Sequence, residues 1–406
     1  MRLTHLSLTN FRAFSRLDLD IPGGIVVLVG DNAQGKTSLL EAVYFLAAFT
    51  SFQTSQDNQV VSFSARNEEI PVSRIVAEYE KGGKRSTLEL RLILQATASS
   101  TGAPVQRLRK EILLNGVKKP ATQAIREFNA VVFIPQMTRF IDNGPEERRR
   151  YLNMTLCQVV PGYAEDLTKY QQALTRRNAL LKMIAEKGGD VSQLDYWDRL
   201  LSGFGARMMA ARSQAVGEIE SLAAPIHAQL TGQTEGFQMM YRSTFNPTDG
   251  KDITNNSSAE VNWREVTAGE LESVFMHRLH STRRVDMARG VTTSGPHRDD
   301  LLFSVNGQNL ADFGSRGQIR TALQSLKLGE MQWMREKTGE MPVMLLDETL
   351  AELDEHRRFG LLQAVSNCEQ VLLTTTDLDL FTPDFLKNSH LWHIASGSVD
   401  PTLPSP

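Results

Sequence analysis

Residues 30–37 read Gly-Asp-Asn-Ala-Gln-Gly-Lys-Thr, which fills every fixed position of the phosphate-binding pattern G-x-x-x-x-G-K-[ST]. An apolar run at residues 25–29 precedes this stretch, and a helical pattern at residues 38–43 follows it. Glycine at both ends lets backbone N–H groups turn toward an anion, and the helix adds the positive end of its dipole. A chance glycine turn rarely matches all these positions in this context. The stretch therefore predicts a site for a nucleoside triphosphate.

Two side chains of this loop carry specific roles in the predicted site. Lys36 is expected to place its charge on the β- and γ-phosphates, and the Thr37 hydroxyl is expected to bind Mg²⁺. The residues expected to contact ATP in this segment are Gly30, Asp31, Asn32, Ala33, Gln34, Gly35, Lys36, Thr37 and Ser38.

A second apolar run, residues 343–346, ends in the acid pair Asp347-Glu348. Asp347 is expected to help hold Mg²⁺, and Glu348 is expected to orient and polarise the attacking water. Two carboxylates after a strand are common by themselves. Combined with the phosphate-binding loop they predict ATP hydrolysis, with Lys36, Asp347 and Glu348 as catalytic residues.

Composition limits the remaining possibilities. The chain has 406 residues, 41% of them hydrophobic, which is enough for a large core and for two lobes. It has no apolar stretch of the roughly 20 residues that cross a bilayer, and no signal-peptide core. The isolated Cys157 and Cys368 are typical of reduced thiols, so we expect a cytoplasmic protein without a membrane partner. The net charge of −3 excludes a uniformly basic surface, so DNA contacts would need local patches.

The pattern along the chain predicts an α/β protein with an inserted helical lobe. Strand-like alternation dominates residues 1–145, and amphipathic helical spacing follows. Two apolar stripes, from Tyr163 to Ile184 and from Trp197 to Leu222, meet at Gly188-Gly189 and predict an antiparallel hairpin. The expected segments are 1–145 (first part of an ATPase head), 146–290 (helical lobe) and 291–406 (rest of the head). Residues 96–105 and 246–260 are expected to be mobile loops, and residues 396–406 to be frayed.

A second anion-binding pattern lies in the last segment. Residues 314–318 read Gly-Ser-Arg-Gly-Gln ahead of a helix, and this loop resembles the signature loop of ABC-type ATPases. In that superfamily the loop caps the γ-phosphate bound by a partner subunit, which implies that Ser315, Gly317 and Gln318 act across an ATP-dependent homodimer. Residues 350–354 resemble the D-loop. Residues 371–377 resemble the switch strand, with Thr376 where transporters have histidine.

The chain as a whole resembles the RecF family of recombination mediators. The most specific carriers are residues 145–152 (Pro-Glu-Glu-Arg-Arg-Arg-Tyr-Leu) and 295–301 (Gly-Pro-His-Arg-Asp-Asp-Leu). Residues 174–181 (Leu-Thr-Arg-Arg-Asn-Ala-Leu-Leu) also carry the resemblance. The resemblance implies an ABC-type P-loop ATPase head. It also implies slow ATP hydrolysis coupled to dimerisation, and binding of DNA at gaps or junctions between single and double strands. RecR and RecO would be partners and RecA an indirect one, in DNA repair, replication restart and the SOS response to DNA damage.

The resemblance adds two residues to the expected site and shows two departures from the family. Arg12 is expected to contact the nucleotide, because the loop after the first strand lies near it in related heads. Gln136 matches an ABC Q-loop position and is expected to bind nucleotide and metal, although the family commonly has an acidic residue there. Gln53 stands where the family has arginine.

Three other readings compete with this one. An SMC-like chromosome-associated ATPase head is the main alternative, although the middle segment is too short for a long coiled coil. A transporter subunit would have its signature loop much closer to Gly30, and a non-enzymatic scaffold would not need Lys36 and Glu348. Sequential acids and a histidine at His297, Asp299 and Asp300 could suggest a metal, but their spacing favours a structural role.

Overall fold

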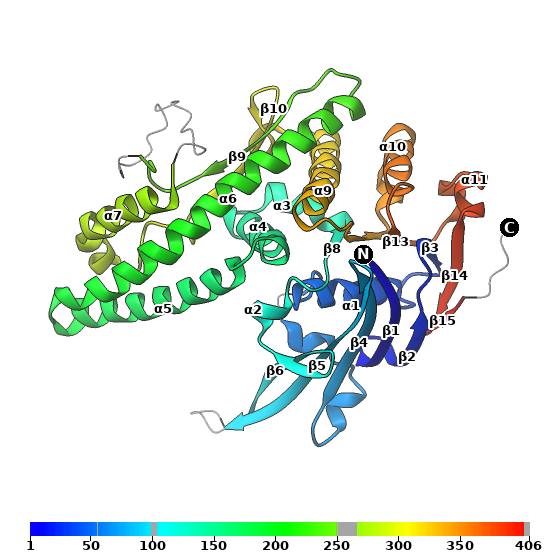
Figure 1. Ribbon diagram of the computed structural model, residues 1–406, viewed down its shortest axis with the longest axis horizontal. Helices are drawn as coiled ribbons and strands as arrows, with labels where there is room; N and C mark the ends of the chain where they lie inside the picture. Colours follow the sequence, from blue (N-terminus) through cyan, green and yellow to red (C-terminus); the bar gives the residue numbers. More distant parts are fainter. Residues whose placement is uncertain (55, 99–103, 249, 251–265, 402–406) are drawn as a thin grey trace. The chain divides into compact units, whose positions relative to one another are not determined.

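The computed structural model describes residues 1–54, 56–98, 104–248, 250 and 266–401 (Figure 1). The chain divides into two compact units. The first unit combines Met1–Met137 with Leu323–Pro406, and the second is Thr138–Ala322.

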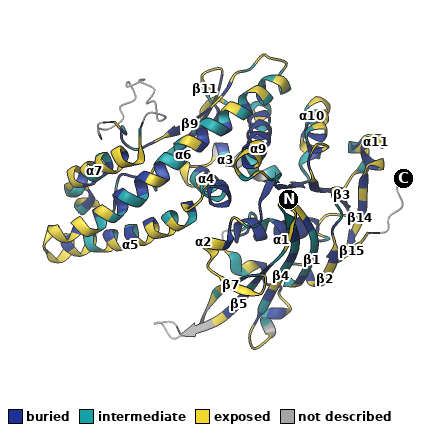
Figure 2. Ribbon diagram, viewed as in Figure 1, coloured by how far each residue is buried: buried dark blue, intermediate teal, exposed yellow. Residues whose placement is uncertain are grey.

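The core of the first unit is a six-stranded sheet in the order β15-β14-β3-β13-β12-β8, parallel except for the β14–β15 pair. The strands β12 and β13 are buried throughout, which explains their continuous apolar runs, since both faces of a parallel sheet are covered. The neighbouring helix α1 is also mostly buried (Figure 2). The helix α1 packs against β12 and β8. The elements of this layer are β3 (Gly24–Val29), α1 (Lys36–Ala48), β8 (Ala130–Phe133), β12 (Val343–Asp347), α10 (Glu355–Val365), β13 (Gln370–Thr375), α11 (Pro383–Lys387), β14 (Ser389–Ala395) and β15 (Ser398–Asp400).

A second sheet of the first unit is antiparallel, in the order β2-β1-β4-β5-β6-β7. Its alternating burial matches the alternation read from the sequence. The prediction of a mobile loop at residues 96–105 is wrong at both ends of that range, because the β5–β6 pairing continues to Ala98↔Pro104. Residues 99–103 lie outside the described residues. The strands are β1 (Arg2–Phe11), β2 (Phe14–Asp20), β4 (Val72–Lys81), β5 (Lys84–Ala98), β6 (Pro104–Leu114) and β7 (Val117–Lys119).

The second unit is built on helices and a small sheet. The helices α5 and α6 pack side by side as the predicted antiparallel hairpin, joined through Gly188 and Gly189, and α7 packs against α6 (Figure 1). The sheet has the order β11-β10-β9. The elements are α3 (Thr138–Asp142), α4 (Pro145–Val159), α5 (Tyr163–Lys187), α6 (Leu194–Leu230), β9 (Phe237–Arg242), α7 (Ala268–Arg289), β10 (Asp300–Val305), β11 (Gln308–Asn309) and α8 (Leu310–Phe313).

The boundaries of the units differ from the predicted segments. Residues 291–322 were expected in the head, but they belong to the second unit, because β10 pairs with β9 along its whole length. The strand β9 was not anticipated from the sequence. The helix α9 (Arg316–Thr338) starts in the second unit and continues into the first. Most of the predicted loop at residues 246–260 lies outside the described residues.

Two remaining expectations concern membranes and thiols. Within the described part of the chain, no helix has the length and apolar character needed to cross a bilayer. Cys157 and Cys368 are buried and free, and burial raises the pKa of each thiol to about 12. Both thiols therefore stay protonated and unreactive near neutral pH.

Candidate nucleotide-binding site

The phosphate-binding loop connects the end of β3 to the start of α1, and glycine is required at Gly30 by a close backbone approach and at Gly35 by a left-handed backbone conformation. A Cβ atom on Gly30 would lie 2.2 Å from the carbonyl oxygen of Ile394. Gly35 has a φ of 112°, and a Cβ atom there would lie 3.2 Å from the ring of Phe14. Ala33 also adopts a left-handed φ of 64°, which is uncommon outside glycine. The neighbouring strands thus determine the path of this loop.

The predicted catalytic residues Lys36 and Glu348 are brought together. Lys36 is 4% exposed, and its ammonium lies 2.8 Å from a carboxylate oxygen of Glu348. It also donates to the backbone carbonyls of Gly30 and Asp31. Glu348 follows β12 with a φ of 47°, so the chain turns sharply at the acid pair. One ammonium therefore holds both the loop and the predicted water-orienting carboxylate.

Thr37 and Asp347 form the second predicted contact of the site. The Thr37 hydroxyl donates to the Asp347 carboxylate at 2.9 Å, and the Thr374 hydroxyl donates to the same carboxylate oxygen at 2.8 Å. Burial is the main reason that the pKa of Asp347 is raised above its ordinary value, and the two hydroxyls partly oppose that shift. The oxygens of Thr37 and Asp347 are hard ligands of the kind Mg²⁺ prefers, so this pair fits the expected metal.

Thr374 was not singled out from the sequence, which placed the switch position at Thr376. The structure leaves Thr376 exposed beyond the end of β13, whereas Thr374 accepts the backbone N–H of Glu348 at 3.0 Å as well as bonding Asp347. Asp347 and Thr374 are register partners in the parallel pair β12–β13. Strand ends that pair in this way share one edge of the sheet, and that register could have identified Thr374.

Gln136 lies in the short 3-10 helix Pro135–Met137, directly after β8. Since Phe133 of β8 is the register partner of Leu346 in β12, this helix starts at the sheet edge that carries Asp347. The side chain of Gln136 is outside the described residues, so its nucleotide and metal contacts remain predictions.

Arg12 lies in the turn between β1 and β2, with a φ of 51°. Its guanidinium makes two hydrogen bonds of 2.7 Å to Glu41, a fully buried carboxylate of α1, and a third of 3.3 Å to the Gln59 carbonyl. Ser51 also donates to Glu41. Arg12 therefore neutralises a buried charge on the helix that follows the phosphate-binding loop. Its contact with nucleotide stays a prediction, and the sequence did not indicate that Glu41 is its partner.

The loop at Ser315 forms a reciprocal cap on α9. The Ser315 hydroxyl accepts the Gln318 backbone N–H at 3.2 Å, and the Gln318 side chain accepts the Ser315 N–H at 3.1 Å. Gln318 also donates to Glu235 at 3.0 Å. Ser315 is exposed, and Gly317 lies in the first turn of this 23-residue helix. The loop thus presents a serine hydroxyl at the positive end of a helix dipole.

His297, Asp299 and Asp300 each have a structural partner. His297 bonds the Tyr170 hydroxyl at 2.7 Å and the Thr292 carbonyl at 3.0 Å. Asp299 accepts from Tyr241 and from the backbone of Thr244, and Asp300 forms a two-pronged pair with Arg148 at 2.8 and 3.0 Å. These contacts agree with the structural role expected for the three residues.

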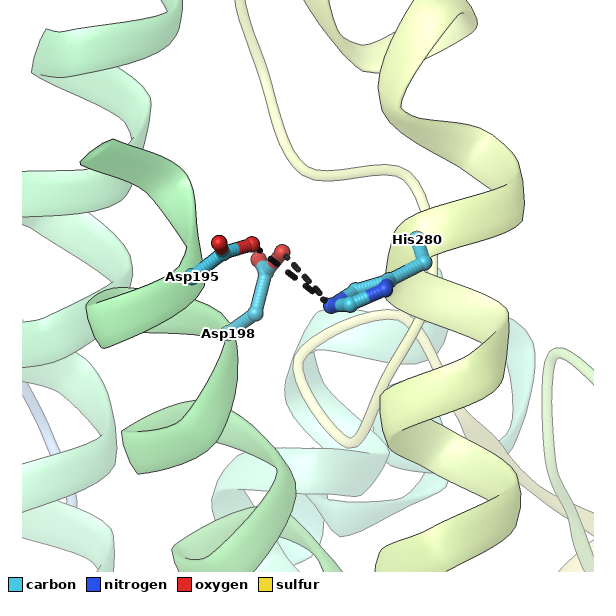
Figure 3. Close-up of side chains that lie close together, drawn as sticks. All are labelled: Asp195, Asp198 and His280. Carbon is cyan, nitrogen blue, oxygen red and sulfur yellow. Dashed lines mark ion pairs between the residues drawn. The ribbon is translucent and has the colours of Figure 1, made fainter. Parts of the chain in front are cut away.

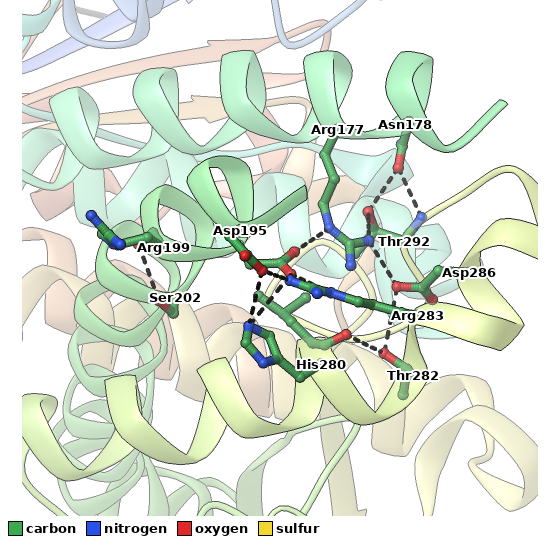
Figure 4. Close-up of polar contacts among 12 residues, drawn as sticks. Arg177, Asn178, Asp195, Arg199, Ser202, His280, Thr282, Arg283, Asp286 and Thr292 are labelled. Atoms are coloured by element: carbon green, nitrogen blue, oxygen red, sulfur yellow. Dashed lines mark hydrogen bonds and ion pairs between the residues drawn. The ribbon is translucent and has the colours of Figure 1, made fainter. Parts of the chain in front are cut away.

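In the described residues, the one cluster with metal-like geometry is Asp195, Asp198 and His280, where α6 faces α7 (Figure 3). Its carboxylates already have cationic partners (Figure 4). Asp198 accepts from Arg177 at 2.6 Å and from Nε of Arg283 at 2.9 Å, and Arg283 also pairs with Asp195. Two guanidinium groups therefore neutralise the carboxylates that a metal ion would need as ligands, and the cluster is an ion-pair network.

Acid is expected to destabilise the second unit through His297. Burial lowers the pKa of His297 from 6.5 to about 4, so the unfolded chain binds more protons between these two values. The stability contributed by neutral His297 is complete above pH 6.5 and is lost as the pH falls, by about 2 kcal/mol at pH 5. Burial shifts the pKa of Asp299 upward, which has the opposite effect on the pH dependence. Denaturant titrations of the parent and of His297→Gln at pH 5 and above pH 6.5 measure the contribution of His297 to the free energy of unfolding. An identical pH dependence of that free energy in the two proteins would contradict this prediction.

Comparisons with known proteins agree along the chain. Residues 2–384 match the family model described as the RecF/RecN/SMC N terminal domain. The chain is 36% identical to the DNA replication and repair protein RecF of Chloroflexus aurantiacus, covering 98% of this chain and 99% of the relative. It is 33% identical to RecF of Herpetosiphon aurantiacus, covering 99% and 100% of the two chains.

Solved structures give the same result. A structure of the recombination mediator protein RecF with ATP, in the RecFOR pathway, matches with a TM-score of 0.81 and 27% identity, covering 99% of this chain and 97% of that one. An SmcHead bound to the C-winged helix domain of ScpA matches with a TM-score of 0.50 and 13% identity, covering 100% and 98%. The second likeness shows the fold alone, which is that of an ABC/SMC-type ATPase head.

Proposed function

The chain belongs to the RecF family of DNA replication and repair proteins, and we propose that it is a recombination mediator that hydrolyses ATP slowly, dimerises on ATP and binds gapped or junction DNA. The observation that carries the enzymatic part is the paired geometry of Lys36 with Glu348 and of Thr37 with Asp347. A scaffold that only retained the fold would not need both pairs.

The geometry suggests how the resting site becomes active. Lys36 is neutralised by Glu348, so a γ-phosphate that binds Lys36 replaces one negative partner with another and releases the Glu348 carboxylate. The freed carboxylate can then accept a hydrogen bond from the attacking water. Thr37 and Asp347 would hold Mg²⁺, which neutralises charge on the phosphates when bound. Thr374 keeps Asp347 and the backbone of Glu348 in place during this exchange.

Dimerisation explains why turnover should be slow. Ser315 already accepts the Gln318 N–H, and its own hydroxyl proton can be donated to a phosphate oxygen. We place that phosphate on a partner subunit, so that hydrolysis waits for assembly of the dimer. The dipole of α9, which begins next to Ser315, favours the anion.

The proposed partners follow from the relatives. Since the matching solved structures are of RecF in the RecFOR pathway, we propose that RecO and RecR cooperate with this chain and that RecA is loaded as a consequence. A cytoplasmic location is part of the same proposal. An SMC-like chromosome-associated head is the second candidate. It is less favoured, because the hairpin of α5 and α6 spans only 25 and 37 residues and the SMC likeness shows fold alone.

Ser315→Arg is expected to abolish ATP-dependent dimerisation and to leave ATP binding by the monomer nearly intact. The arginine would add bulk and positive charge where the dimer closes, and a change at the centre of an interface weakens the dimer by at least about 30-fold. Light scattering with ATP measures the dimer, and a fluorescent nucleotide measures the monomer site. Ser281→Arg, on the exposed face of α7, is the matched control. ATP-dependent dimers of Ser315→Arg at parental concentrations would refute the contact of Ser315 with the nucleotide of a partner subunit.

DNA binding is expected to be tighter with ATP than with ADP, and to weaken steeply with salt. With a net charge of −3 the monomer has no general attraction for DNA, so the dimer must align local basic patches. Each neutralised phosphate adds about −0.9 to the log–log salt slope. By linkage, DNA should promote dimerisation by the same factor. Titration of labelled duplex and gapped DNA at two salt concentrations tests this. Equal affinity with ATP and with ADP would contradict DNA binding by the ATP-bound dimer and would leave the proposed ATP hydrolysis standing.

A further inference from the structure

The strongest feature outside the known motifs is the turn between β14 and β15, at Ser396 and Gly397. Residues 396–406 were expected to be frayed, and that prediction is wrong for 396–400, because Ala395↔Ser398 closes a two-residue hairpin. Ser396 and Gly397 have φ values of 49° and 74°, as a tight hairpin of this kind requires. The strand β15 lies beside β2 at the edge of the first unit (Figure 1).

This turn is bonded to the phosphate-binding loop at one residue, Gln34. The Ser396 N–H donates to the Gln34 side-chain oxygen at 2.6 Å, and the Gly397 N–H donates to the Gln34 carbonyl at 3.2 Å. Close backbone approaches reinforce the contact. Ile394, at the end of β14, leaves no room for a side chain on Gly30, and Ala13 leaves none on Gly397, where a Cβ atom would lie 2.6 Å from its carbonyl oxygen.

The bond to the Gln34 carbonyl has a consequence for the next residue. A trans peptide unit is planar, with its C=O and N–H pointing in opposite directions. When the Gln34 carbonyl points at Gly397, the N–H of Gly35 points away from the turn. Backbone N–H groups of this loop are the donors that bind phosphate in the motif. The hairpin turn therefore sets the direction of one of these donors before the nucleotide arrives.

We propose that the Ser396–Gly397 turn is a positioning element for the phosphate-binding loop, and that nucleotide binding and the order of this turn are coupled. The proposal rests on nucleotide binding at Lys36 and Thr37 and is independent of dimerisation. It assigns to the last described strand of the chain a direct role in nucleotide affinity. The nucleotide site and the Ser396–Gly397 turn share the Gln34 peptide. Nucleotide binding must therefore favour the ordered turn by the same factor by which the ordered turn increases nucleotide affinity.

Gly397→Ala tests the coupling against a matched glycine. Alanine at Gly397 meets the Ala13 carbonyl, whereas alanine at Gly116, with a nearly equal φ of 77°, meets nothing within 4 Å. The two variants share the backbone strain and differ in the clash. We expect Gly397→Ala to weaken binding of a fluorescent ATP analogue by at least about fivefold, the lower end of couplings between linked sites. Gly116→Ala should bind like the parent, and equal affinities in the two variants would overturn the proposal.

A second variant and a second readout separate positioning from simple destabilisation. Gln34→Met keeps the side-chain length and removes the acceptor for Ser396, and it should also weaken binding, with an unchanged melting temperature. In the parent, ATP should slow hydrogen exchange of the amides of Ser396 and Gly397. Unchanged exchange on ATP addition would overturn the coupling. Failure of the parent itself to bind the analogue would instead refute the proposed function.

Discussion

Replacing Glu348 with glutamine is expected to lower ATP turnover by about 10²- to 10⁴-fold, the usual contribution of a positioned general base. Glutamine keeps the shape of the side chain but cannot accept a proton from water. It also removes the negative charge that lies 2.8 Å from the Lys36 ammonium. Since a phosphate would no longer compete with that carboxylate, ATP affinity should be equal or higher. The variant should therefore accumulate as an ATP-bound dimer.

Single-turnover hydrolysis and light scattering with ATP measure the two effects of Glu348→Gln. Glu355→Gln is the matched control, because Glu355 is exposed in the first turn of α10, outside the site. It should hydrolyse ATP as the parent does. Turnover of Glu348→Gln within about tenfold of the parent would remove Glu348 from the catalytic role. If Glu348→Gln loses turnover as expected but forms no dimers with ATP, the catalytic role of Glu348 stands and the ATP-dependent assembly is contradicted.

The parts of the site that the sequence predicted are those whose chemistry dictates a local pattern. A loop that turns its N–H groups toward phosphate needs Gly30 and Gly35 at fixed spacing, and a carboxylate at a sheet edge needs an apolar run before Asp347. The structure brings these residues together through Lys36 and Thr37. The strand, loop and helix of the nucleotide site followed from these patterns, whereas the ABC/SMC-type head was implied by the resemblance to ABC-type ATPases and to the RecF family.

The parts that could not be predicted depend on partners far apart in the sequence. Nothing local shows that Thr374 pairs with Asp347, that Glu41 binds Arg12, or that the Gly397 turn meets Gln34. Each contact is fixed by strand register or by the path of a neighbouring turn. The predicted start of the last head segment, at residue 291, differs from the structure for the same reason. The strand β10 joined the second unit because β9, a short half-polar strand, supplied its partner.

Residues 174–181, which carry part of the resemblance to the RecF family, supply an internal support of the second unit. Arg177, which is fully buried in α5, bonds Asp198 of α6 at 2.6 Å and Asp286 of α7 at 2.7 Å (Figure 4). It also donates to Thr292 at 2.9 Å, and the neighbouring Asn178 accepts from the same threonine. One guanidinium thus joins three helices and the segment that leads to His297. Such a network makes one arrangement of the helices strongly preferred.

Arg177→Met is therefore expected to lower the free energy of unfolding by about 3–5 kcal/mol, the cost of leaving a buried charge without its partner. Methionine fills similar space but cannot bond Asp286, and Asp198 would keep one guanidinium partner, Arg283, instead of two. Arg207→Met is the matched control on the same hairpin, because Arg207 is 48% exposed in its pair with Asp166. An exposed pair contributes about 0–1 kcal/mol.

Denaturant unfolding followed by circular dichroism compares these two arginine variants. Asp286→Asn combined with Arg177→Met should be less destabilised than the sum of the single variants, because the double variant buries one charge fewer. Equal losses for Arg177→Met and Arg207→Met, or strict additivity in the double variant, would show that the buried network does not hold the helices.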